Sequence, residues 1–281
     1  MSTQVAVVAA IAGIGAYALY MRQNGAKQSD KPIFSSMGFH SLKLHSSELI
    51  SHNTKRLRFE LPDASQPSGL SLTSALLTVS FPNGRWVPVL RPYTPVNDLN
   101  EPGFIELMVK LYPGGKQSSH LHSLKPGDKL TFLPIKELQW RPNMHPHVAL
   151  IAGGAGITPM YQLARGILQN PDDRTAITLV WGVNTDDDIF LRAEFAEMQK
   201  KHPGRFKAVY VVAEPKAGSP HQKGFVTSKL LEEAGLGAKE EKNRDVKVMV
   251  CGPPPMMKAL NARGTGVLAQ LGYRPDQVHS F

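Results

Sequence analysis

Cysteine is almost absent from this chain of 281 residues, whose one thiol is that of Cys251. A single cysteine cannot form an internal disulfide or supply a four-ligand zinc or iron–sulfur site. Disulfide scaffolds, zinc–cysteine modules and self-contained ferredoxin domains are therefore excluded. The histidine pairs His120/His122 and His145/His147 are i, i+2 pairs, whereas a helical zinc site needs i, i+4. We expect no metal site.

Several catalytic motifs are also missing. The chain holds no Gly-Lys-Ser/Thr of a Walker loop, no Gly-x-Gly-x-x-Gly of a Rossmann turn and no Gly-x-Ser-x-Gly elbow. A cysteine nucleophile would need a neighbouring base, and no cysteine-enzyme signature surrounds Cys251. These absences argue against hydrolysis through a covalent intermediate.

Basic side chains outnumber acidic ones by 32 to 23, which gives a formal net charge of +9, and 42% of the residues are hydrophobic. The chain is therefore globular and long enough for two cores. The positive balance favours an acidic partner, but the densest basic cluster, residues 55–58, alternates like the two faces of a strand. Because it lacks interleaved aromatic residues, we expect no nucleic-acid partner.

An uncharged apolar run covers residues 5–21, about 17 residues against the roughly 20 that a membrane-spanning helix needs. No charged side chain precedes it, unlike a secretory signal, and Arg22 and Lys27 follow it. We expect a retained membrane anchor over residues 1–22 and a flexible tether over residues 23–36; a cleaved targeting sequence is the alternative. The positive flank favours a cytosolic body, unless a mitochondrial import route overrides it.

Two hydrophobic patterns divide the rest of the chain. Between residues 39 and 132, short alternating runs are separated by Pro, Gly, Asn and Asp turns, which predicts an antiparallel β-barrel with a short helix over residues 118–124. From residue 147 onward, continuous apolar strands alternate with helical segments, one of them covering residues 188–202. This second pattern predicts an α/β doubly wound parallel sheet.

Prolines between residues 134 and 146 separate the two patterns. We therefore expect the barrel domain at residues 37–140 and the α/β domain at residues 141–281.

Ligands of a doubly wound sheet bind beyond the carboxyl ends of its strands. One such end is the Ala-Gly-Gly-Ala-Gly-Ile-Thr-Pro sequence of residues 152–159, where glycines admit a ligand to the backbone. Thr158 can cap the following helix and Pro159 suits its first turn. Open amides and the helix dipole favour an anion such as a pyrophosphate. Close packing of helix against strand is the alternative reason for these glycines.

Another strand end, residues 251–256, reads Cys-Gly-Pro-Pro-Pro-Met, and an inert buried thiol is the alternative to a functional one there. In the barrel half, residues 91–95 read Arg-Pro-Tyr-Thr-Pro. They supply a guanidinium for phosphate, an aromatic face and a hydroxyl, which are the groups that a phosphorylated flat heterocycle needs. An ordinary strand end with a surface arginine and a core tyrosine would look the same.

Taken in order, these segments resemble the NADH–cytochrome b5 reductases, and most of all their fungal mitochondrial form with one N-terminal anchor. The resemblance rests on RPYTP (91–95), VKLYPGGKQSSHL (109–121), GGAGITPM (153–160), CGPPPMM (251–257) and Phe281. It implies FAD in the barrel, NADH in the α/β domain and the acidic haem protein cytochrome b5 as acceptor. It also implies a monomer on the mitochondrial outer membrane, with a processed intermembrane-space form or the endoplasmic reticulum as alternatives.

The resemblance implies roles for single residues. Arg91 would pair with the FAD pyrophosphate, Tyr93 would lie against the flavin, and Thr94 would hydrogen-bond near flavin N5. Cys251 would stand close to nicotinamide C4. The catalytic set is then Thr94, Lys110 and Cys251. The residues implied for FAD are Arg91, Pro92, Tyr93, Thr94, Val109, Lys110, Tyr112, Gly115, Lys116, Gln117 and Ser118. Those implied for the nicotinamide nucleotide are Gly153, Gly154, Gly156, Thr158, Pro159, Cys251, Gly252, Pro253 and Met256, and Phe281 completes the cofactor-binding set.

Two positions depart from the family's pattern. Gln117 stands where methionine is common, but backbone amides make the contacts there, so FAD binding is expected to survive. Ala213 ends a parallel strand where many relatives carry an acid that accepts from the adenine ribose, and Glu214 is its nearest substitute. NADH remains the expected donor. The alternatives are a reductase for another one-electron acceptor and a non-catalytic, membrane-tethered nucleotide-binding module.

Overall fold

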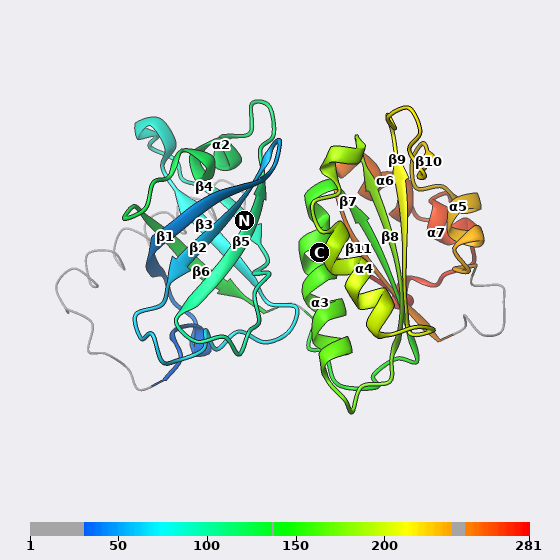
Figure 1. Cartoon of the computed structure of the whole chain (residues 1–281), viewed down its shortest axis with the longest axis horizontal. Coiled ribbons are helices and arrows are strands. Elements are labelled where there is room, and N and C mark those ends of the chain that lie inside the picture. The colour runs from blue at the N-terminus through cyan, green and yellow to red at the C-terminus, as the bar shows by residue number, and fades with distance from the viewer. Residues whose placement is uncertain (1–30, 137, 238–244) are drawn as a thin grey trace, which may run out of the picture.

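The computed structural model describes residues 31–136, 138–237 and 245–281, which form two bodies, each built on a six-stranded sheet (Figure 1). The anchor expected over residues 1–22 and most of the tether lie outside the described residues. Within the described ranges, no helix is both long and apolar enough to cross a bilayer.

The first sheet is antiparallel throughout, in the order β4-β3-β6-β1-β2-β5. Its strands are β1 (His40–Ser51), β2 (Thr54–Glu60), β3 (Ala75–Ser80), β4 (Val89–Tyr93), β5 (Phe104–Lys110) and β6 (Lys129–Ile135), with the short turns η1 (Ile33–Ser35) and η2 (Pro82–Gly84). In β2, the predicted alternation buries Leu57 and Phe59 and leaves Arg56 and Arg58 half-buried on the other face.

The sheet curls around one apolar core, in which Phe59 and Phe132 meet edge to face with ring centroids 5.1 Å apart. The helix α2 (Lys116–Ser123) inserts the fully buried Leu121 into this core. It packs against both β4 and β5, which are the two edge strands of the sheet. The motifs of the first domain therefore meet where the two sheet edges approach the same helix.

The second sheet is parallel throughout, in the order β10-β9-β8-β7-β11-β12. Its strands are β7 (His147–Gly153), β8 (Ala176–Val183), β9 (Phe206–Val212), β10 (Gln222–Lys223), β11 (Val246–Cys251) and β12 (Val278–Ser280). The helices are α3 (Ile157–Gln169), α4 (Arg192–Lys201), α5 (Ser228–Glu233), α6 (Pro254–Asn261) and α7 (Val267–Gln270), and the short turns are η3 (Gly154–Gly156), η4 (Asp186–Asp188) and η6 (Pro275–Gln277).

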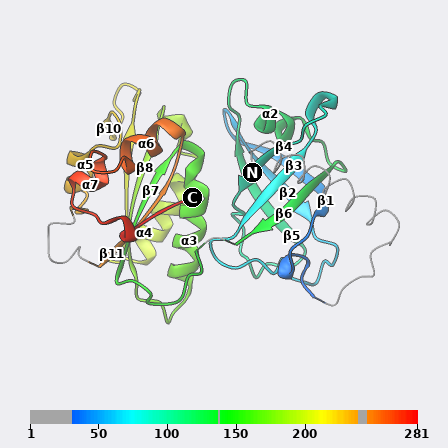
Figure 2. The same cartoon turned by 180° about the vertical axis from the view of Figure 1, so that it is seen from behind.

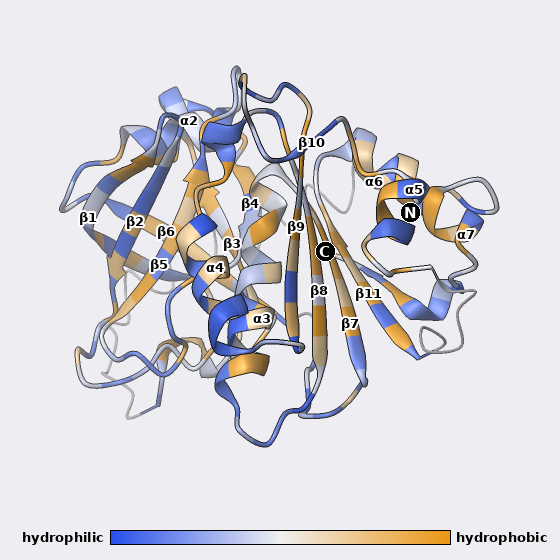
Figure 3. Cartoon of the chain, turned by 45° about the vertical axis from the view of Figure 1, so that its right-hand side comes forward, coloured by the Kyte–Doolittle hydropathy of each residue, from blue (hydrophilic) through white to orange (hydrophobic). Residues whose placement is uncertain are grey.

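Both faces of this sheet are covered, as its apolar strands predict. Figure 3 shows β7, β8 and β11 largely hydrophobic along their length. One core lies under α3 and α4, and the other lies under α5, α6 and α7. The front and back views place α3 on the side of the sheet that faces the barrel (Figure 1, Figure 2). The first core also takes in Val96 and Met108 of the barrel domain, so the two domains share buried apolar surface.

Two local predictions were wrong. The helix expected over residues 188–202 begins only at Arg192, because Asp188 instead ends the turn η4 and accepts from Thr185 in a capping box. Thr158 does not cap α3, which begins after Gly156; Thr158 lies inside the first turn and donates to the carbonyl of Ala155 at 3.3 Å.

Candidate functional site

The edge strand β4 presents Arg91 and Tyr93 beside the first turn of α2. Arg91 is exposed, and its guanidinium donates to the carbonyl of Leu90 at 2.7 Å, with no carboxylate partner in the described part of the chain. Burial raises the pKa of Tyr93 to about 12, with a contribution from nearby Tyr112, so the phenol stays neutral. Thr94, which follows the strand, is 7% exposed. This edge offers a positive charge and an aromatic ring to a ligand.

The N-terminus of α2 is held open by its own turn. Gly115 precedes the helix and provides no side-chain cap for the amides of the first turn. The hydroxyl of Ser118 accepts from the amide of Tyr112 and donates to the carbonyl of Gly115, both at 3.2 Å. A Cβ at position 115 would lie 2.5 Å from that hydroxyl, so glycine is required. The uncapped amides and the helix dipole favour an anion beside exposed Lys116.

Gln117 points away from this anion site and into the barrel. Its side chain is buried, accepts from the hydroxyl of Ser80 at 2.5 Å and donates to the hydroxyl of Thr78 at 2.7 Å. Thr78 in turn donates to the carbonyl of Arg91 at 2.9 Å. A buried chain of hydrogen bonds therefore joins the first turn of α2 to the backbone of β4.

The glycine-rich turn after β7 serves packing and exposure at different positions. A Cβ on Gly156 would lie 2.3 Å from the carbonyl oxygen of Cys251, and one on Gly153 would lie 2.4 Å from the sulfur of Met256. These two glycines let the ends of β7 and β11 approach each other. Gly154, at φ +52°, has the hydroxyl of Tyr112 as its nearest such neighbour, at 3.5 Å. The packing alternative thus accounts for Gly153 and Gly156, whereas Gly154 faces the barrel's tyrosine.

Tyr112 is where the two domains' motifs meet. Its hydroxyl accepts from the amide of Ala155 in the glycine-rich turn at 3.4 Å, across 43 positions of sequence. Burial raises the pKa of Tyr112, and the charge of Cys251 acts in the same direction, so that thiol lies within electrostatic reach. Tyr112 is still 41% exposed. The end of β5, the turn before α3 and the end of β11 therefore border one solvent-accessible space.

This space coincides with the topological switch point of the parallel sheet. From β7 the chain continues through β8 to β9 on one side, whereas β11 lies on the other side of β7. A crevice forms between two strand ends from which the connections leave in opposite directions, and such crevices bind ligands. Gly252 and Pro253, which follow β11, lie in it beside Gly153. Phe281 packs against the neighbouring core, and its amide donates to the carbonyl of Val250 at 3.0 Å.

Lys110 is placed differently from what the resemblance implies. It is 7% exposed and forms an ion pair with Asp188 of the other domain. Asp188 also accepts from the side-chain amide of Asn53 and from the amide of Thr185, both at 3.1 Å. Asp188 and Asn53 were not among the candidate residues; the apolar pattern around Asp188 had predicted only a helix.

The segment after the Arg-Pro-Tyr-Thr motif is held by α3. Gln162 donates to the carbonyls of Pro95 at 2.8 Å and Asn97 at 3.2 Å, and Arg165 donates to the carbonyl of Val96 at 3.1 Å. These side chains project from the helix that follows the glycine-rich turn. Both halves of the site therefore rest on the same rigid helix.

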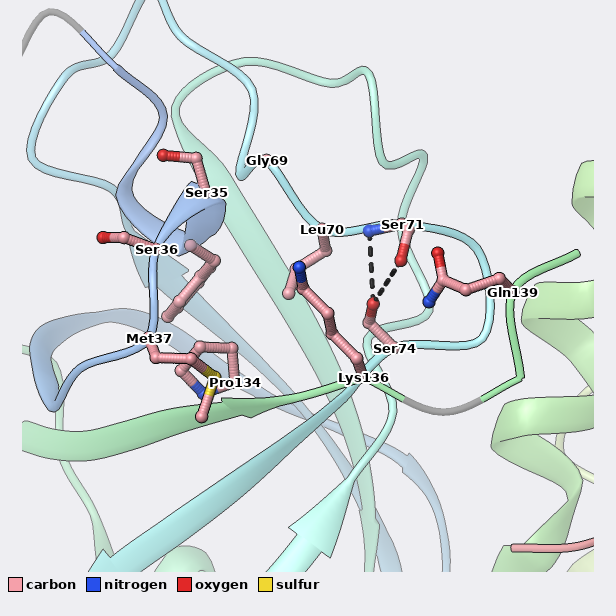
Figure 4. Close-up of a pocket in the computed structure, with 11 residues that line it drawn as sticks. Ser35, Ser36, Met37, Gly69, Leu70, Ser71, Ser74, Pro134, Lys136 and Gln139 are labelled. Atoms are coloured by element: carbon pink, nitrogen blue, oxygen red, sulfur yellow. Dashed lines mark hydrogen bonds between the residues drawn. The ribbon is translucent and has the colours of Figure 1, made fainter.

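Two hollows lie outside this crevice. A groove of about 810 Å³ runs between the β1–β2 hairpin at residues 50–52 and the segments 186–193 and 216–219. A cavity of about 140 Å³ lies at the far end of β6, among the segments shown in Figure 4. There the hydroxyls of Ser71 and Ser74 bond each other at 2.8 Å, and Ser74 also accepts from the amide of Ser71 at 3.2 Å. Because these groups satisfy each other, the cavity shows no set of polar groups converging on a ligand.

The donor set of the crevice fits two dinucleotides. Arg91 and the open amides of α2 form one anion site, and the open turn at Gly154 before α3 forms another. Tyr93 and Tyr112 lie between them and offer aromatic surface to flat rings. The residues present therefore fit FAD on the barrel side and NADH on the sheet side.

Comparisons with known proteins agree with this division. The family model of the oxidoreductase FAD-binding domain matches residues 41–137, and that of the oxidoreductase NAD-binding domain matches residues 150–262. NADH-cytochrome b5 reductase 2 of Pyricularia oryzae is 43% identical to this chain and aligns with 99% of it and 88% of the relative. The enzyme of that name from Emericella nidulans is 44% identical, over 98% of this chain and 89% of its own length.

Among solved structures, the cytochrome b5 reductase domain of Ulva prolifera nitrate reductase superposes with a TM-score of 0.78 at 29% identity, and covers 89% of this chain and all of that domain. The CS-b5R domains of human Ncb5or superpose with a TM-score of 0.71 at 21% identity, over 90% of this chain and 71% of that one. The second likeness concerns the fold alone.

Proposed function

Since the chain belongs to the NADH–cytochrome b5 reductase family, we propose that it is a flavoenzyme that takes two electrons from NADH and delivers them singly to cytochrome b5. The observation that carries this function is the contact between Tyr112 and Ala155. It brings the end of the barrel strand β5 to the glycine-rich turn of the parallel sheet. Two nucleotide sites of the required chemistry therefore open into the same crevice.

Bound FAD would supply the redox chemistry, because it accepts a hydride and releases single electrons, which no side chain of the chain can do. The chain's own residues bind and orient. Arg91 and the first turn of α2 hold the flavin's phosphates, and Tyr93 supports its ring system. Gly154 leaves room at the helix start for the second pyrophosphate, and Cys251 borders the space where the two rings meet. No general acid or base is needed at this step.

The test is an anaerobic absorbance titration of the FAD-loaded protein with NADH. We expect a yellow protein that bleaches with one equivalent of NADH and regains its colour when oxidised cytochrome b5 is added. A protein that stays colourless after incubation with FAD would contradict the proposed function and favour the non-catalytic binding module.

Cytochrome b5 is the proposed acceptor, and a quinone, ferric chelate or oxygenase component is the alternative, since the hydride site is common to such reductases. The name shared by the relatives supports cytochrome b5. Steady-state competition between the candidate acceptors tests this. We expect cytochrome b5 to suppress reduction of the others, and the reverse order of preference would overturn the assignment.

We also propose that residues 1–22 anchor a monomer to the mitochondrial outer membrane. The uncharged run over residues 5–21 and the basic flank at Arg22 support the anchor, and the resemblance to the fungal mitochondrial form supports the membrane. Alkaline carbonate extraction of purified mitochondria tests both ideas. The protein should remain with the outer-membrane pellet, and its release into the soluble fraction, or recovery with the endoplasmic reticulum, would contradict them. Light scattering of the detergent-solubilised protein should give the mass of one chain.

A further inference from the structure

The adenosine half of the nicotinamide nucleotide has a defined direction in this fold. Its nicotinamide must approach the barrel, which happens at Tyr112 and the end of β11. Its pyrophosphate belongs at the start of α3. The remaining half then extends away from β11, over the carboxyl ends of β8 and β9, because these strands follow β7 in the sheet. The residue that ends β9 is therefore the one that meets the adenine ribose.

That residue is Ala213. Its amide donates to the carbonyl of Val183 at 3.0 Å, and the amide of Glu214 donates to the carbonyl of Asn184 at 2.8 Å, so the backbone is fixed against β8. In dinucleotide sites of this type, an acidic side chain at the strand end accepts from the ribose 2′-hydroxyl and repels a 2′-phosphate. A methyl group does neither. This position consequently does not discriminate between a hydroxyl and a phosphate.

A positive charge stands beside Ala213. The short strand β10 pairs with the end of β9 so that Lys223 lies opposite Val212, the residue before Ala213. Lys223 is exposed, and its ammonium makes no hydrogen bond or ion pair within the described ranges. Two residues later, Phe225 is 76% exposed and offers a flat face to a base. A phosphate on the ribose would thus meet an uncommitted cation.

The acidic groups nearby are mostly engaged. Asp186 accepts from the hydroxyl of Ser219 at 2.6 Å and from the amide of Lys216 at 2.8 Å. Asp187 pairs with the ammonium of Lys216 at 2.6 Å. Glu214 is exposed and makes no side-chain bond within the described residues, so nothing fixes its carboxylate at a ribose and water screens its charge. Arg192, at the start of α4, adds a further exposed cation on this side.

From this arrangement we propose that the adenosine end of the site accepts a ribose 2′-phosphate, so that the chain binds and oxidises NADPH as well as NADH. The inference rests on the proposed function, since it concerns the same nucleotide site. The hydride leaves the same carbon of the nicotinamide in both donors. What differs is only the phosphate that Ala213 admits and Lys223 attracts.

Calorimetric binding of 5′-ADP and 2′,5′-ADP to the FAD-loaded protein tests the proposal without relying on turnover. We expect the wild type to bind 2′,5′-ADP within about threefold of 5′-ADP. Ala213→Asp should weaken 2′,5′-ADP about tenfold, the ratio given by 1.4 kcal/mol, and leave 5′-ADP unchanged or tighter. Lys223→Gln should weaken only 2′,5′-ADP. Ala217→Asp, on an exposed alanine of the same loop, is the charge control and should leave the ratio unchanged.

The outcomes are distinct. If 5′-ADP binds and 2′,5′-ADP binds more than about thirtyfold more weakly, the proposal is overturned while the proposed function stands. If Glu214→Gln raises 2′,5′-ADP affinity about tenfold, Glu214 is the acid that reads the ribose and the proposal fails in that way instead. If neither nucleotide binds, the proposed function itself is wrong. Rapid bleaching of the flavin by NADPH would be the corresponding redox result.

Discussion

Lys110 of the barrel and Asp188 of the parallel sheet form a buried ion pair across the domain boundary, with side chains that are 8% and 3% exposed. Burial alone would raise the pKa of Asp188, but the hydrogen bond and charge of Lys110 outweigh it, so the pKa lies below its ordinary value. Asn53 contributes a further hydrogen bond from the barrel side. The pair therefore links β5 to the turn η4 and sets how the two nucleotide-binding edges face each other.

Removing one member of this pair should be far more harmful than removing both. Asp188→Leu leaves a buried ammonium without a partner, which we expect to lower the free energy of unfolding by about 3–5 kcal/mol. The double variant Lys110→Met/Asp188→Leu should regain most of that loss. Urea unfolding of the three proteins measures both effects.

The exposed pair Glu197–Lys201 on α4 is the matched control, because its side chains are 63% and 65% exposed. Lys201→Met should change the free energy of unfolding by less than about 0.5 kcal/mol. A loss of under about 1 kcal/mol for Asp188→Leu would show that the buried pair is not a structural link.

Arg91 should determine FAD affinity. Its guanidinium is free to pair with a phosphate, and a charge-assisted hydrogen bond contributes about 1.5–3 kcal/mol, so Arg91→Ala should weaken FAD binding about 10- to 100-fold. Arg85→Ala removes an equally exposed cation from the loop before β4 and should have little effect. Quenching of flavin fluorescence during reconstitution gives both constants. Equal losses in the two variants would mean that only general positive charge matters.

Gln117 should act on FAD through the backbone of β4. Gln117→Ala leaves the buried hydroxyls of Thr78 and Ser80 without their partner, each at a cost of about 1–3 kcal/mol, and frees the first turn of α2 from β4. We expect weaker FAD binding and a shifted flavin absorbance band, because the phosphate-binding elements lose their register. Ser119→Ala, on the exposed face of the same helix, is the control. A lower unfolding midpoint with unchanged FAD affinity and spectrum would restrict Gln117 to a structural role.

Acid should release FAD by loosening α2. Burial lowers the pKa of His122 from 6.5, an effect that its bond to the carbonyl of Val109 only partly opposes, while the charge of Lys55 lowers it further. Burial also lowers the pKa of His120. As pH falls, the unfolded chain binds these protons first, so their stabilising contribution is complete above pH 6.5 and is lost as pH falls through the folded pKa values.

The measurement is free flavin fluorescence between about pH 7 and pH 5. We expect release to increase toward the acid end, and His120→Gln/His122→Gln to flatten the profile. A double variant with the wild-type profile would assign the acid sensitivity to other groups.

The net charge of +9 should accelerate the encounter with acidic cytochrome b5. The second-order rate of cytochrome b5 reduction should fall as ionic strength rises, since exposed charges are screened within about 8 Å at physiological salt. Reduction of the flavin by NADH, measured separately, serves as the reference. A cytochrome rate that does not depend on salt would argue against a charge-guided encounter.

The sequence by itself determined the two architectures and the order of their motifs. Apolar residues at every second position in β2 and continuous apolar runs in β7 and β11 are local patterns that reflect which faces of a strand are buried. The segments at residues 91–95, 153–160 and 251–257 are equally local. They can therefore be identified in the chain without its three-dimensional arrangement, together with the cofactors that their resemblance implies.

Tertiary structure alone decided which side chains meet. Lys110 and Asp188 are 78 positions apart, and neither periodicity nor motif spacing carries information about a contact between two domains. The same holds for Gln117, whose partners Ser80 and Thr78 lie on another strand. Gly156 could have served a ligand or a neighbour, and only the carbonyl of Cys251, 2.3 Å from a Cβ at that position, identifies the neighbour. Such contacts depend on the summed geometry of both domains, which local sequence does not specify.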